Sequence, residues 1–80
     1  MEHLIVGSTY RHYSGKLYEL IEVVTDSETF EKQVVYQELF EKFEILVCHY
    51  SVFTALVPGN TLMPVFEWFR SGIDKELRIK

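Results

Sequence analysis

Short runs of β-branched and aromatic residues, separated by turn residues, set the pattern of the chain. The run from Leu17 to Val24 has apolar side chains on both parities, which predicts a strand that is covered, at least in part, on both faces. Similar runs predict strands over 33–39, 45–50 and 65–69. Upstream, the glycine-punctuated segment from Gly7 to Glu19 predicts a strand, a tight turn and a second strand.

Turn signals separate these runs. Clusters of turn residues occupy 25–29 and 58–60, and Pro64 stands just before the last run, where a missing backbone donor is tolerated. A short helical turn is expected near 51–54. The pattern therefore predicts a mainly β fold, which is either a small, strongly bent sheet or an SH3-like, partly open barrel, with about five strands and one helical turn.

The segment 26–43 also fits a helix. A residue of the preceding turn cluster would cap it, and Val35, Leu39 and Phe43 would form a stripe with helical spacing. The run Val34-Val35-Tyr36 favours a strand instead, because β-branched and aromatic residues pack well on a pleated surface.

Length and charge limit the classes of function. The 80 residues suit one domain, which we place at 1–71, followed by a charged C-terminal tail at 72–80. Residues 1–69 carry four basic and ten acidic side chains, a net charge of −6, while residues 70–80 carry four basic and two acidic ones, a net charge of +2. An acidic body repels phosphate backbones, so the composition argues against nucleic-acid binding.

Targeting and metal signals are also lacking in the sequence. No apolar run approaches the roughly 20 residues that span a bilayer, and the N-terminus lacks the basic leader of a secretory signal. We therefore expect a cytoplasmic protein that does not engage a membrane. Cys48 is the single cysteine and the three histidines lie in distant segments, so we expect no disulfide, no metal site and no cofactor.

An aromatic cluster near the N-terminus carries the functional interpretation. Aromatic rings give a large contact area at low entropic cost, and one imidazole and one amide would orient a ligand. We predict a non-catalytic binding module for a peptide or a small molecule, with its ligand-binding surface at Tyr10, His12, Tyr13, Tyr36 and Gln37. The competing interpretation is that these aromatic residues fill and rim a small core.

Two alternative functions use other features of the chain. His12 would serve a small hydrolase as acid or base, but the sequence places no serine, cysteine or carboxylate to work with it. A purely structural homodimer would use the last strand: if Phe66 and Trp68 share its inward face, Phe69 faces outward toward a second chain. The competing expectation for that strand is that all three rings are buried in one core.

Several motifs occur in an order that is typical of one family. The matching residues are Tyr10, His12, Tyr13, Gly15, Tyr18 and Glu19, then Ser27, Glu28, Thr29 and Glu31, then Val34, Val35, Tyr36, Gln37 and Leu39, and finally Phe53, Pro64 and Phe66. Through them the chain resembles, over about residues 7–69, a small bacterial family known only as a domain of unknown function, number sixteen fifty-three. The resemblance implies a small β-rich domain and brings no established activity.

Some positions depart from the family pattern. Two of its arginines are replaced by Cys48 and Val65, so an anion bound by those arginines in relatives is not expected to bind here in the same way. Turn glycines are replaced by Phe30, Glu41 and Glu44, so we expect the loop conformations to differ.

Overall fold

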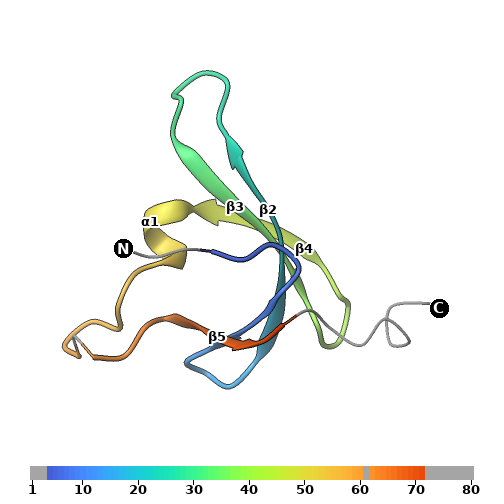
Figure 1. Ribbon diagram of the computed structural model, residues 1–80, viewed down its shortest axis with the longest axis vertical. Coiled ribbons are helices and arrows are strands. Elements are labelled where there is room, and N and C mark those ends of the chain that lie inside the picture. The colour runs from blue at the N-terminus through green and yellow to red at the C-terminus, as the bar shows by residue number, and fades with distance from the viewer. Residues whose placement is uncertain (1–3, 61, 72–80) are drawn as a thin grey trace.

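The protein is a single open β-sheet with one short helix. The computed structural model describes residues 4–60 and 62–71. Five strands pair in an antiparallel manner in the order β4-β3-β2-β1-β5 (Figure 1). The elements are β1 (Thr9–His12), β2 (Leu17–Thr25), β3 (Lys32–Glu38), β4 (Ile45–His49), α1 (Tyr50–Phe53) and β5 (Phe66–Arg70). The predicted mainly β fold is confirmed as a bent, open sheet, whereas an SH3-like barrel is not confirmed, because the sheet does not close.

The segment 26–43 contains a strand, so the helical alternative is wrong. Residues 32–38 form β3, which pairs with β2 in a hairpin that projects from the rest of the molecule (Figure 1). Its turn is held by Asp26, whose Oδ1 accepts the backbone N–H groups of Glu28 at 2.8 Å and Thr29 at 3.1 Å. Such a side-chain turn competes with helix formation at the same residues.

Strand β2 contains a bulge that explains its apolar residues on both parities. The register with β3 shifts between Leu20 and Glu22, so Ile21 is the extra residue. Leu20 pairs with Tyr36 and Val23 pairs with Val34, and these four residues therefore share one face of the sheet despite their odd spacing in β2. A bulge bends its strand and increases the local twist, which curves the sheet around that face.

The curved face holds a very small core. Among the described residues, four hydrophobic ones are buried: Tyr10, Leu20, Val34 and Phe53. Phe53 comes from α1, which follows β4 directly and turns its ring onto the sheet. The expected helical turn near 51–54 is therefore confirmed, and it supplies the residue that closes the core.

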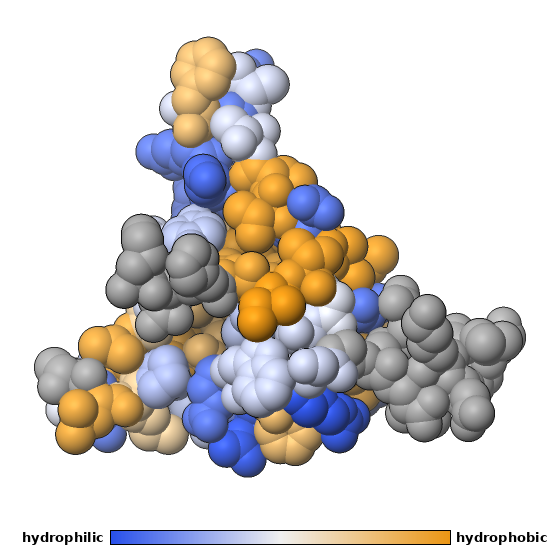
Figure 2. All heavy atoms as spheres, in the orientation of Figure 1, coloured by the Kyte–Doolittle hydropathy of each residue, from blue (hydrophilic) through white to orange (hydrophobic). Residues whose placement is uncertain are grey.

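The loop between α1 and β5 brings the last strand back beside β1. The Val65 N–H donates to the Ala55 carbonyl at 2.9 Å, and the Val57 N–H donates to the Met63 carbonyl at 2.7 Å. Many apolar side chains stay exposed. In the view of Figure 2, one apolar patch lies where β2, β3 and β4 cross, and smaller ones lie at the tip of the β2–β3 hairpin and at the loop between α1 and β5. Within the described residues, no helix has the length and apolar character needed to cross a membrane. The predicted tail at 72–80 lies outside the described residues.

Candidate functional site

A continuous set of aromatic rings covers the concave face of the sheet. Tyr18 stands at its centre, and its ring makes edge-to-face contacts with four others. The centroid distances are 5.3 Å to Tyr36, 5.4 Å to Phe40, 5.5 Å to Phe66 and 6.3 Å to His12. Edge-to-face pairs of this kind add stability beyond the area that they bury. We call His12, Tyr18, Tyr36, Phe40 and Phe66 the aromatic face.

A pocket opens at one end of the aromatic face. The ring of Phe66 stacks on Phe53 at 4.1 Å with only 6° between the planes, and Tyr10 meets Phe53 edge-on at 5.4 Å. These three rings form the inner wall of a pocket of about 170 Å³. Its other lining residues are Leu4, Thr54, Leu56, Pro64, Glu67 and Trp68. We call this cavity the Trp68 pocket.

A hydrogen bond to the Tyr10 side chain and a backbone bridge hold the walls of the Trp68 pocket in place. The Ile5 N–H donates to the Tyr10 hydroxyl at 3.0 Å, which fixes the N-terminal segment beside the pocket and satisfies a buried phenol. On the opposite side, Leu56 and Pro64 form an isolated antiparallel bridge. The pocket is thus built from segments that are far apart in the sequence, and neither its Leu4 wall nor its Leu56 wall carries a motif.

The structure places the predicted site residues in four different places. His12 and Tyr36 lie on the aromatic face, and Tyr10 is buried in the wall of the pocket. Tyr13 lies at the β1–β2 turn, where its ring packs on His12 at 4.6 Å. Gln37 does not join them: its Nε2 donates to the Phe43 carbonyl at 2.9 Å and holds the turn before β4.

His12 sits in a local turn contact with Ser14. Its Nδ1 lies 2.9 Å from the Ser14 hydroxyl and accepts the Ser14 N–H at 3.1 Å. This serine partner was not predicted, although it lies only two residues from His12 in the sequence. Burial and the nearby charge of Lys16 lower the pKa of His12, so the imidazole is neutral near pH 7. Both contacts belong to the same turn, and in the described residues no carboxylate lies within ion-pair distance of this ring.

The aromatic face is uncharged at neutral pH. Burial, followed by the neighbouring Cys48, raises the pKa of Tyr36 to about 12. Burial likewise raises the pKa of the Cys48 thiol, although its hydrogen bond with Tyr36 opposes that shift. A thiol in this state is a poor nucleophile. Burial and Glu38 also raise the pKa of Tyr18, so the face offers neutral rings and hydroxyls rather than charges.

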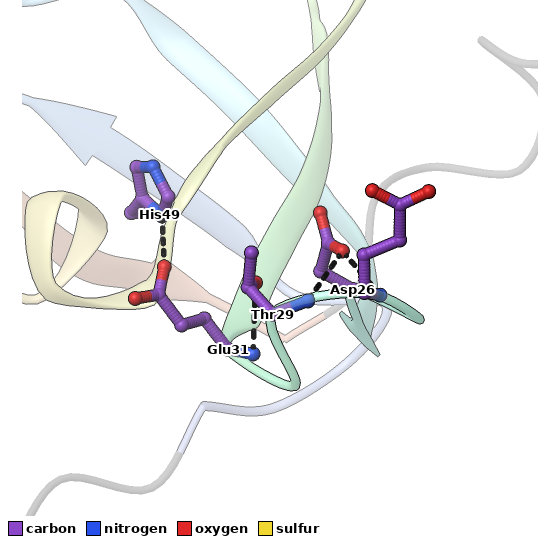
Figure 3. A network of polar contacts seen from close by, with 5 residues as sticks. Asp26, Thr29, Glu31 and His49 are labelled. Carbon is purple, nitrogen blue, oxygen red and sulfur yellow. Dashed lines mark hydrogen bonds and ion pairs between the residues drawn. The ribbon is translucent and has the colours of Figure 1, made fainter.

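A second hollow lies between the start of β3 and the junction of β4 with α1. It is wide, about 370 Å³, and is lined by Glu31, Lys32, His49, Tyr50 and Ser51. The His49 Nδ1 lies 3.5 Å from the Glu31 Oε1, beside the turn that Asp26 holds (Figure 3). Both side chains of the pair are more than half exposed, and an exposed ion pair contributes little stability. Among the residues that the structure describes, no group of three His, Cys, Asp or Glu side chains could hold a metal ion.

The comparisons with known proteins identify the family. A family model described as "Protein of unknown function (DUF1653)" matches residues 8–68. The chain belongs to the DUF1653 family. A crystal structure of a DUF1653 protein from Bordetella bronchiseptica is 23% identical, covers 88% of this chain and 92% of its own, and superposes with a TM-score of 0.71. A search of curated proteins found no match.

The DUF1653 motifs occupy clear places in this fold. Tyr18 and Tyr36 build the aromatic face, and Tyr10 and Phe66 build the pocket. Cys48 of β4 lies beside Tyr36 and influences its pKa. Phe30 and Glu41, two of the three positions at which the resemblance implied glycine in relatives, have positive φ angles of 62° and 49°, which is the conformation that glycine favours. Glu44, the third position, is not among the non-glycine residues with positive φ.

Proposed function

We propose that this DUF1653 protein is a non-catalytic binding module, and that the Trp68 pocket with the adjoining aromatic face accepts an apolar or aromatic group of a peptide or small molecule. The observation that supports this is the volume of the pocket. An enclosed apolar cavity of about 150 Å³ accommodates benzene. The Trp68 pocket has a similar volume, about 170 Å³, but it is partly open to solvent and its lining includes Thr54 and Glu67. The proposed surface keeps Tyr10, His12, Tyr13 and Tyr36 from the sequence prediction and adds Phe66 and Trp68.

The chemistry of the surface supports binding rather than catalysis. The side chains around the pocket are mostly apolar. The groups on the aromatic face are neutral at pH 7, because tyrosines ionise only at high pH and because burial and Lys16 lower the pKa of His12. The Glu67 carboxylate is paired with Arg11 at 3.3 Å. A surface of this kind gains affinity mainly by burying apolar area, with a few polar groups at its rim for orientation.

The single tryptophan of the chain allows a direct test. We would titrate the protein with N-acetyl-phenylalaninamide, N-acetyl-leucinamide and N-acetyl-lysinamide and follow Trp68 fluorescence together with backbone amide NMR shifts. The phenylalanine probe should shift the signals of Trp68 and its pocket neighbours with a dissociation constant on the order of 1 mM, because one side chain buries little area. The lysine probe should shift them far less.

A matched pair of variants locates the response. Leu56 lines the pocket, while Leu62 lies in the same loop, is 92% exposed and is not part of the lining. Leu56→Arg should remove the probe-induced shifts, and Leu62→Arg should leave them unchanged. Equal responses to all three probes, or shifts that persist in Leu56→Arg, would count against the proposal.

A further inference from the structure

Strand β4 has the composition of a pairing edge. It lies at one end of the strand order, so only β3 pairs with it in the described part of the chain. Proteins usually protect an exposed edge with Lys, Pro, a bulge or an inward charge. The five residues Ile45–His49 include no Pro, Lys, Arg, Asp or Glu, and the register with β3 is unbroken.

The free backbone groups of β4 point away from the sheet. The Glu38 N–H donates to the Glu44 carbonyl at 2.9 Å, so this pair is of the hydrogen-bonded type. Hydrogen-bonded and non-hydrogen-bonded pairs alternate along an antiparallel ladder. The N–H and C=O groups of Ile45, Val47 and His49 therefore face outward, where a further strand would bind them.

Apolar side chains accompany these free groups. Ile45 is 62% exposed and Val47 is 57% exposed, and both lie on the face opposite the core. Val47 pairs directly with Val35 of β3, and Phe43, 51% exposed, precedes the strand. The edge thus combines unpaired backbone groups with an apolar stripe, which is the usual signature of strand addition.

The other edge of the sheet is protected. Strand β5 carries Glu67 and Arg70, and Glu67 is paired with Arg11. Its outward ring, Phe69, has the guanidinium groups of Arg11 and Arg70 at 5.5 Å and 5.2 Å from its centroid. The expectation that the three rings of this strand are all buried is wrong, because Trp68 is 48% and Phe69 38% exposed. Although these rings are exposed, the charged side chains Glu67 and Arg70 make β5 a poorer edge for pairing with another strand than β4.

From this contrast we infer that two copies of the chain associate through antiparallel β4–β4 pairing about a two-fold axis at Val47. The symmetry places Val47 opposite itself and Ile45 opposite His49 of the partner subunit. A strand without Lys, Arg, Asp or Glu meets its own copy with no pairing of such like charges along Ile45–His49, although residues 1–69 carry a net charge of −6. A standard protein–protein interface buries about 800 Å² on each side, and the whole surface of this molecule is 5818 Å². A single strand of five residues covers less than such an interface. We therefore expect a dimer that forms only at high protein concentration.

Sedimentation velocity over a concentration series extending into the millimolar range tests the dimer. The wild type should shift from monomer toward dimer as concentration rises. Val47→Lys should weaken association by about tenfold or more, because two ammonium groups would meet at the axis. Leu62→Lys makes the same kind of change at an exposed site away from the strand, and it should associate as the wild type does.

Cross-linking tests the register. A hydrogen-bonded antiparallel pair has its Cα atoms about 5.5 Å apart, which lies within the range that a disulfide accepts. In a Cys48→Ser background, Val47→Cys should form an intermolecular disulfide under mild oxidation, and Leu62→Cys should form far less. A wild type that stays monomeric throughout, a Val47→Lys variant that associates normally, or equal cross-linking at positions 47 and 62 would each overturn the inference.

Discussion

Phe30 combines an unfavourable backbone conformation with an exposed side chain. Phe30 lies at the tip of the β2–β3 hairpin with φ 62° and is 77% exposed. A bulky residue in the left-handed region is strained, and its ring gains little there from burial. The hydrogen bonds of Asp26 and the bond from the Phe30 N–H to the Asp26 carbonyl impose this turn.

The cost of that conformation can be measured by comparing two variants. Phe30→Gly should leave the free energy of unfolding unchanged or raise it by up to about 1 kcal/mol, because relief of the strain is partly offset by the flexibility of glycine in the unfolded chain. Phe30→Ala keeps the Cβ atom and should be less stable than Phe30→Gly by about 1 kcal/mol in urea unfolding. If the alanine variant is as stable as the glycine variant, the left-handed backbone carries no strain.

Residue-level predictions from sequence depend on how much of the outcome is local. The predicted ligand-binding surface joined Tyr36 and Gln37, but adjacent residues of a strand face opposite sides, so β3 separates the two side chains. The sequence also does not reveal that Tyr10 is buried while Tyr13 is 52% exposed, because the burial of Tyr10 involves Phe53, which lies more than forty residues further along the chain. The serine partner of His12 was within reach of the sequence, since a Ser two residues from a His at a turn is a local signal.

At the scale of elements, the bulge in β2 controls how the sheet curves. Ile21 is the extra residue between Leu20 and Glu22. Without it, successive side chains of β2 would point to alternate faces of the sheet along the whole strand. From sequence, the apolar residues on both parities indicate a strand covered on two faces. In the structure, the change of parity comes from the register shift at Ile21. The periodicity of the sequence alone does not distinguish such a shift from a strand that is covered on both faces.

Deletion of Ile21 should therefore preserve the faces but reduce the bend. Leu20 and Val23 would still point to the core, and we expect the domain to fold with a free energy of unfolding lower by about 1–3 kcal/mol. Deletion of Val23, the residue paired with Val34, should cost more, about 2–5 kcal/mol, because it removes a core contact. Thermal unfolding followed by circular dichroism compares the two. A larger loss from the Ile21 deletion would contradict the assigned register.

The strands themselves were predictable because their signals are local. β-Branched and aromatic runs and the turn residues between them fix the elements to within one or two positions. The competition between helix and strand over 26–43 was settled by pairing with β2, through contacts such as Val23 with Val34, which sequence periodicity does not contain. The open form of the sheet likewise depends on which strands find partners.

At the scale of the whole molecule, stability rests on very few side chains. Tyr10, Leu20, Val34 and Phe53 are the buried hydrophobic residues among those described, and a domain of this size has a free energy of unfolding on the order of 5 kcal/mol. Many other apolar residues are exposed. The molecule therefore has little reserve against loss of a core contact.

Leu20→Ala should lower the free energy of unfolding by about 2–5 kcal/mol, since Leu20 has no exposed surface and the vacated volume cannot fill. Much of the protein would then be unfolded at 37 °C. Leu62→Ala, at a residue that is 92% exposed, should change stability by less than about 0.5 kcal/mol. Urea unfolding gives both values, and similar losses for the two variants would show that the core lies elsewhere.

The hydrogen bond between the Ile5 N–H and the Tyr10 hydroxyl has a practical consequence. It anchors Leu4 against the Trp68 pocket. A purification tag fused ahead of Met1 would therefore begin only three residues from a wall of that pocket. Affinities measured with such a fusion would include competition from the tag itself, so the tag should be cleaved before any ligand screen.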